Sequence, residues 1–208
     1  TDENLLIPLL HSLPETVKSV NVTMGYPIKT TLAYTFLERM IALQTHCQLS
    51  GGSERFYHVD VTGLLTHPYI KDVCGVKAQK LAADIISKRA VLVGSSMFDG
   101  KDILRDIFSY NIADSRVLSK YLIDVMSQVV VSIGDIAQRE YLRVVIEEVK
   151  KIVLSIDNCG LDVSVDVFIS LLRRHMQSLS IPFEGEPVEG LQIMGILETR
   201  NIDFENVV

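Results

Sequence analysis

Apolar side chains recur at three- and four-residue spacing along most of the chain, and this spacing predicts amphipathic helices. A shorter helix begins near Phe56 and must end before His67-Pro68, because the residue that precedes a proline is pushed out of the helical region. Thr30, Ser115 and Ser164 are good N-cap residues in front of three of the predicted helices. The main helices are predicted over 3–12, 30–49, 77–89, 101–109, 115–131, 135–157 and 164–176.

Short β-type segments lie on both sides of this helical block. Residues 20–24 are rich in β-branched side chains and end at Gly25, and 191–194 alternate like a strand. Residues 90–93 fit either a strand or a buried connector, and periodicity does not decide between them. The pattern predicts a mainly α (α+β) fold, in which a bundle-like helical insertion lies between two strands of a sheet completed elsewhere.

Composition and charge narrow the picture. With 208 residues, 48% of them apolar, the chain is long enough for one or two folded cores. It has no apolar run long enough to cross a bilayer and no signal-peptide pattern, so we expect a cytoplasmic protein without a membrane partner. Cys47, Cys74 and Cys159 form no CxxC pair, which favours reduced, structural thiols.

The net charge of −6 argues against a strong grip on a phosphate backbone by this chain alone. Small basic clusters occur at 88–89, 150–151 and 173–175, each in or beside a helical pattern. A solvated helix face explains each cluster more simply than a DNA contact does. We therefore expect weak DNA binding or none.

The usual chemical motifs are missing from the sequence. It has no phosphate-binding loop, no GxGxxG turn, no HExxH and no GxSxG motif around Ser95 and Ser96. His58, close to Asp60, is the only histidine near a carboxylate in the sequence, and we expect no metal role for it. We therefore assign no catalytic or metal-binding residue and expect the chain by itself to be inactive.

The two ends of the sequence suggest a piece of a longer protein. The chain begins at Thr1 without a methionine, and it stops at Val208 inside what we expect to be a strand. We divide it into a strand-turn segment at 1–29, a helical accessory subdomain at 30–180 and a return segment at 181–208.

Both flanks resemble one protein family. The segment 191–204, LQIMGILETRNIDF, resembles the fifth conserved motif of UvrD/RecB-type helicases, with Gly195, Leu197, Arg200 and Asn201 departing from the family pattern. The segment 20–27, VNVTMGYP, is similar to the strand and glycine turn that lead from the second motor domain into its accessory subdomain. Together they resemble AddB-like helicase/nuclease subunits with a PD-(D/E)XK nuclease domain.

The resemblance implies that the flanking strands belong to a truncated P-loop-type motor domain. The parent protein would be an ATP-dependent helicase and exodeoxyribonuclease that uses ATP and Mg²⁺ in double-strand-break repair, and a second helicase/nuclease subunit is a possible partner. Thr199, Arg200 and Asp203 would lie near nucleotide phosphate or single-stranded DNA, or else Arg200 is a turn residue that pairs with Glu198 or Asp203.

Three hypotheses follow. The first is a noncatalytic DNA-handling or regulatory segment of such a helicase/nuclease. The alternative is a helical protein–protein interaction module with no nucleic-acid role, which would bind a partner at an exposed apolar helix face. A structure without pairing between residues 20–24 and 191–194 would favour this alternative. A freestanding hydrolase is a third class, which the sequence does not support.

Overall fold

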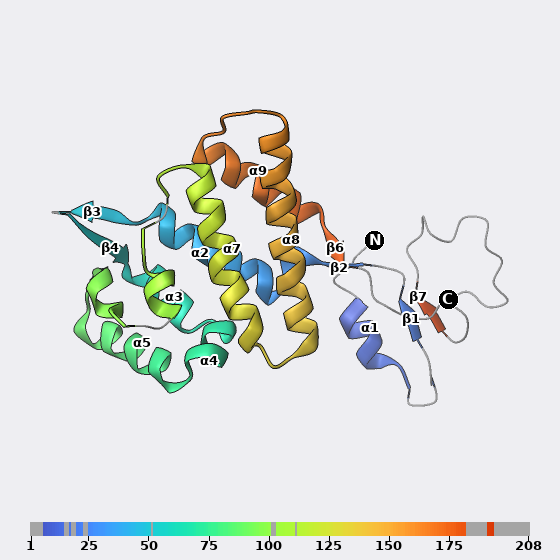
Figure 1. Cartoon of the computed structure of the whole chain (residues 1–208). Coiled ribbons are helices and arrows are strands. Elements are labelled where there is room, and N and C mark those ends of the chain that lie inside the picture. The colour runs from blue at the N-terminus through green and yellow to red at the C-terminus, as the bar shows by residue number, and fades with distance from the viewer. Residues whose placement is uncertain are drawn as a thin grey trace. The chain divides into compact units, whose positions relative to one another are not determined.

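The computed structural model describes residues 6–14, 17, 20–22, 25–50, 52–100, 103–110, 112–181 and 191–193. The fold is mainly helical, with a few short strands in small sheets (Figure 1). The chain divides into two compact units: unit 1 comprises Thr1–Ile28 with Ser178–Val208, and unit 2 comprises Lys29–Gln177. Each unit is described by itself.

Unit 1 brings the two ends of the sequence together through strand pairing. Its described elements are α1 (Leu6–Ser12), β1 (Val20–Val22), β2 (Tyr26–Pro27), β6 (Ser180–Ile181) and β7 (Leu191–Ile193). Strand β1 pairs with β7 in parallel, so that Val20 lies opposite Leu191, and β2 pairs with β6 in antiparallel fashion. Segments 20–24 and 191–194 thus do pair within their described residues, and the whole of unit 2 lies between them in sequence.

Gly25, between β1 and β2, allows a close approach of the returning chain. A Cβ atom at Gly25 would lie 2.6 Å from Cβ of Ser180 and 3.3 Å from its carbonyl carbon. Neither atom is the end of a flexible side chain, so any larger residue would push β6 away. The glycine that the sequence suggests as the end of a strand is required here by packing as well.

Unit 2 contains the helical block. In chain order, its elements are α2 (Leu32–Thr45), β3 (Gln48–Ser50), β4 (Ser53–Tyr57), α3 (His58–Leu65), α4 (Pro68–Cys74), α5 (Val76–Lys88), β5 (Leu92–Gly94), α6 (Ile103–Ile107), α7 (Ser115–Ser132), α8 (Ile136–Asn158) and α9 (Val165–Ser178). A 3-10 turn at Ile28–Thr30 leads into it from unit 1.

The helix boundaries follow local capping chemistry, with two corrections to the sequence prediction. Thr31, not Thr30, caps α2 by accepting a hydrogen bond from the Tyr34 amide, because Thr30 lies in the preceding 3-10 turn. Asp114, not Ser115, caps α7 by accepting one from the Val117 amide. Ser164 caps α9 as predicted, with the Val167 amide 3.4 Å from its Oγ.

The segment after α2 differs from the prediction. Ser50 and Ser53, which the sequence placed in a flexible stop, instead pair with each other in a β-hairpin of β3 and β4, where Gly52 has a positive φ of 75°. Phe56 lies in β4 rather than in a helix, opposite Val93 of β5, and both side chains are buried. Residues 92–94 are therefore a strand, which decides the question that periodicity left open.

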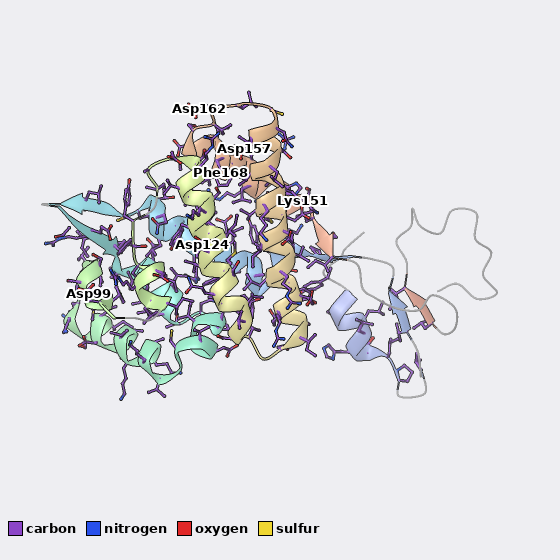
Figure 2. The ribbon with its side chains drawn as sticks, viewed as in Figure 1. Asp99, Asp124, Lys151, Asp157, Asp162 and Phe168 are labelled. Carbon is purple, nitrogen blue, oxygen red and sulfur yellow. The ribbon has the colours of Figure 1, made fainter. Side chains whose placement is uncertain are left out.

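The core of unit 2 is built from aliphatic side chains of α2, α3, α7, α8 and α9. Helices α7 and α8 lie side by side and form the longest helical contact (Figure 1). Phe168 from α9 is 1% exposed and lies near the upper end of this pair (Figure 2). Ile136 was predicted on the apolar face of α8, but its side chain is 75% exposed at the first residue of the helix. Fully buried residues include Phe36, Leu37, Met40, Leu64, Leu118, Leu122, Val129, Leu142, Val145, Val149 and Leu172.

Candidate functional site

The residues that the family resemblance singles out, Thr199, Arg200 and Asp203, lie outside the described residues. The described structure shows the strand that leads to them, β7, and its parallel partner β1, with Asn21 opposite Gln192. A candidate site must therefore be sought in the side chains of unit 2, where nearly every residue is described.

His67 is the most deeply buried histidine among the described residues, and its environment is structural. It caps α4, with Nδ1 accepting a hydrogen bond from the Tyr69 amide, so the ring proton lies on Nε2, 3.2 Å from Oγ1 of Thr35. Burial, and secondarily the charge of Arg39, lower the pKa of His67 to about 4. The ring packs between Phe36 and Tyr69. A neutral, capped and enclosed imidazole is part of the core, not a general base.

Helix α9 is held to its neighbours by two polar clusters. Glu148 on α8, 9% exposed, accepts hydrogen bonds from Lys151 Nζ at 2.5 Å and His175 Nε2 at 2.7 Å. Burial raises the pKa of Glu148, but these two donors outweigh burial and hold the pKa below its ordinary value. On the other side, Arg173 binds Glu38 of α2 with two nitrogens. Both clusters fix the position of α9.

The histidine that meets Asp60 is distant from it in the sequence. Asp60 binds His46, with 2.8 Å between Oδ2 and Nδ1, and not its near neighbour His58. His46 opens onto a shallow groove of about 260 Å³, whose walls include Thr45 and Ser170. The described residues show no hydroxyl hydrogen-bonded to His46, and none of their His, Cys, Asp and Glu clusters could hold a metal ion. The pair therefore joins α2 to α3 and gives no sign of a reaction centre.

The basic clusters differ in how their charges are matched. On α8, Lys150 binds Glu147, Lys151 binds Glu148, and Arg143 binds Glu140. Arg173 is bound to Glu38. On α5, Lys88 binds Asp84, whereas Lys80 has no ion pair with a described residue, and neither has Arg174 on α9.

We call Lys77, Lys80 and Lys88 the α5 lysine face. Residues three, eight and eleven apart on a helix lie within one side of it, and all three side chains are exposed. Lys77 and Lys80 border a shallow hollow of about 530 Å³ together with Val76 and Asp84. Asp84 binds Lys88 at 2.7 Å, and Lys80 has no ion pair with any described residue. Within this face, Lys80 is therefore the lysine whose charge no described acid pairs.

The end of α5 adds a further cation. Arg89 has φ 49° and ψ 34°, and it is the only non-glycine residue in the described part of the chain with a positive φ. Glycine is the usual residue at this left-handed helix end, because a Cβ there costs energy. Arg89 thus places an exposed guanidinium beside the lysine face at a conformational cost.

Charge is also divided unevenly between the two units. Residues 29–177 contain 18 Lys and Arg against 17 Asp and Glu, so the acidity of the chain comes from the remaining residues, with 2 against 9. The net charge of −6 is therefore a poor guide to unit 2. Within unit 2, segment 68–89 contains five basic residues and two acidic ones. The five are the three lysines of the α5 lysine face together with Lys71 and Arg89.

Among the described residues, no helix has both the length and the apolar character that crossing a membrane requires. Cys47, Cys74 and Cys159 are free thiols. No protein-family model, no curated protein and no solved structure matches the chain.

Proposed function

We propose that unit 2 is a noncatalytic DNA-handling module, carried as an insertion on the parallel sheet of an ATP-dependent helicase/nuclease of the UvrD/RecB kind. ATP and Mg²⁺ would be held by the motor part of such a protein, which would act in double-strand-break repair. Unit 2 would contact the DNA backbone without reading its sequence. The alternative that we retain is a helical protein–protein interaction module.

The observation that carries the proposal is the parallel pairing of β1 with β7. Parallel strands occur almost only in sheets that are covered on both faces, and a two-stranded sheet is marginally stable alone. A parallel pair whose connection is an entire helical unit is typical of an insertion between neighbouring strands of a larger α/β sheet. The pairing supports the proposal because the resemblance to the helicase family predicts an insertion of this kind.

The α5 lysine face supports the DNA part of the proposal. Lysine is a compact, flexible cation that binds phosphate as a point charge, and backbone contacts of this kind give sequence-independent affinity. Lys80 and Arg89 have no ion pair with a described residue, so binding phosphate would cost no internal salt bridge there. Nonspecific binding of this kind has a Kd on the order of 10–100 μM at physiological salt.

The test is a fluorescence-anisotropy titration of the chain with a tailed DNA duplex at several salt concentrations. We expect weak, salt-dependent binding that is lost in the triple variant Lys77→Gln, Lys80→Gln, Lys88→Gln. The slope of log affinity against log salt should fall by about 2 to 3, since each phosphate contact contributes about 0.9.

A matched triple variant controls for net charge. Arg116→Gln, Arg143→Gln and Lys150→Gln also remove three positive charges, but each of these residues is exposed and bound to an acid. We expect this variant to bind DNA within about twofold of the original chain. Equal losses of DNA affinity in both triple variants would mean that net charge alone causes the binding. If the original chain does not bind DNA even at near-millimolar protein, the DNA-handling proposal is rejected.

The alternative function draws on a different surface. Val167 and Leu171 of α9 are 51% and 45% exposed, which is the kind of apolar helix face that a protein partner covers. Absence of DNA binding together with a protein complex that depends on α9 would favour the interaction module.

A further inference from the structure

The outward side of α9 is apolar at its centre and charged at its two ends. We define the α9 outer face as Asp166, Val167, Ser170, Leu171 and Arg174, which together line a shallow hollow of about 280 Å³. Residues at three-, four- and eight-residue spacing lie on one side of a helix. All five side chains are exposed.

The inner side of the same helix is fixed to unit 2. Phe168, Ile169, Leu172 and Met176 are buried there. The Arg173–Glu38 and His175–Glu148 pairs bind α9 to α2 and α8 on its flanks. The outer face is thus presented on a rigid helix, so a partner would lose little affinity to ordering of α9 on binding.

The charges on the outer face are complementary to each other but too far apart to pair within one helix. Asp166 and Arg174 are eight residues apart, about 12 Å along the axis at 1.5 Å per residue. Neither residue forms an ion pair with any described side chain of its own chain. Midway between them is Ser170, whose small side chain allows another helix to approach closely.

We propose that the occupant of this face is α9 of a second copy of the chain, packed antiparallel about a twofold axis at Ser170. This arrangement brings Asp166 of one copy beside Arg174 of the other, twice over. It also places Val167 of each copy against the partner's Leu171. A twofold interface requires a self-complementary patch, and the order acid, apolar, small, apolar, base satisfies that requirement in the antiparallel direction.

The resulting dimer is weak, because one pair of helical faces is smaller than a standard stable interface. A Kd on the order of 100 μM is consistent with such a contact. The inference does not depend on the proposed DNA-handling function, since α9 and the α5 lysine face are separate surfaces with different tests. Dimerisation would leave the lysine faces of both copies in place.

The test is sedimentation analysis of the chain between about 10 μM and 1 mM, where such a dimer forms. We expect concentration-dependent dimerisation of the original chain and a monomer throughout for Leu171→Glu. The matched control is Ile86→Glu on α5, where a still more exposed apolar residue (64%, against 45% for Leu171) is replaced and dimerisation should not change. Thermal unfolding of each variant establishes that it remains folded.

Charge reversal gives a sharper result than loss of dimerisation alone. Asp166→Arg places two arginines together at each end of the interface, and Arg174→Asp places two acids there, so each single variant should weaken the dimer at least fivefold. The double variant Asp166→Arg with Arg174→Asp restores both pairs and should recover most of the original affinity. A monomeric original chain, an equal effect of Ile86→Glu, or a double variant no better than the singles would each overturn the proposal.

Discussion

The interior of unit 2 and the outer faces of α5 and α9 differ in how their polar groups are matched. Among the described residues, every buried side-chain nitrogen or oxygen has a hydrogen-bond partner. On the two outer faces, Lys80, Asp166 and Arg174 have no ion pair within the described chain. Leaving a buried polar group unmatched costs 1 to 3 kcal/mol, whereas a solvated charge costs almost nothing. The matching of the interior therefore follows from the requirements of folding, whereas the surface charges can stay unmatched because water solvates them.

The same contrast separates histidines that look alike in the sequence. His67 is enclosed and neutral, while His46 and His175 are more exposed and bound to carboxylates. His67 Nε2 lies 3.2 Å from the Thr35 hydroxyl, whereas His46 and His175 each bind a carboxylate.

The largest expected effect comes from protonating the interior. The pKa of His67 is about 4 when folded and about 6.5 when unfolded, so the unfolded chain takes up the proton first as the pH falls. Stability is fully present above pH 6.5 and is lost between pH 6.5 and pH 4, by about 3.5 kcal/mol at about 1.4 kcal/mol per unit. His67→Asn keeps a good N-cap and should remove this loss. Urea unfolding of both proteins from pH 7 to pH 4 measures it, and parallel curves would contradict the assignment.

A second expected loss of stability tests the hydrogen bonds of Glu148, at the edge of the interior. Glu148→Gln removes the charged acceptor of Lys151 and His175 and should lower the free energy of unfolding by about 2 kcal/mol at pH 7. Glu147→Gln is the neighbouring control, because Glu147 is exposed and binds only Lys150, and it should cost less than about 0.5 kcal/mol. Denaturant unfolding compares the two. Equal losses would mean that burial of Glu148 adds nothing.

Local sequence patterns predicted most of the helices but not the contacts between them. The spacing of apolar residues located α5, α7, α8 and α9 because helix periodicity is set by the backbone. The β3–β4 hairpin was missed because its strands are short and largely polar, so a glycine pair resembled a loop. The pairing of Asp60 with His46 was also missed, since the hairpin brings together residues 14 apart.

The candidate surfaces were even less accessible to sequence reasoning. The three basic clusters look equivalent in the sequence, and only the structure shows which cations are matched. Part of the difference follows a local rule, since Asp84 pairs with Lys88 rather than Lys80, and an acid four residues before a lysine is the favoured orientation on a helix. The bond between Arg173 and Glu38 follows no such rule, because it joins α9 to α2.

A smaller effect separates folding from binding at the end of α5. Arg89→Gly relieves the left-handed backbone and should raise the free energy of unfolding by about 0.5 to 1 kcal/mol. The same change removes a cation beside the lysine face and should weaken DNA binding. Thermal unfolding and anisotropy titration of this variant measure the two quantities. A gain in stability with unchanged DNA affinity would separate Arg89 from the proposed binding surface.

The smallest expected effect comes from removing the acidic residue of the α5 lysine face. Asp84→Asn frees Lys88 from its exposed partner and removes the one acid on that face, so DNA affinity should rise two- to fivefold with a steeper salt dependence. Stability should change by less than about 0.5 kcal/mol, because an exposed i,i+4 pair contributes little. Glu147→Gln frees Lys150 on α8 in the same way and should leave DNA affinity unchanged. If both variants bind DNA more tightly, net charge alone governs binding. If only Asp84→Asn binds more tightly, binding depends on the position of the lysines on α5.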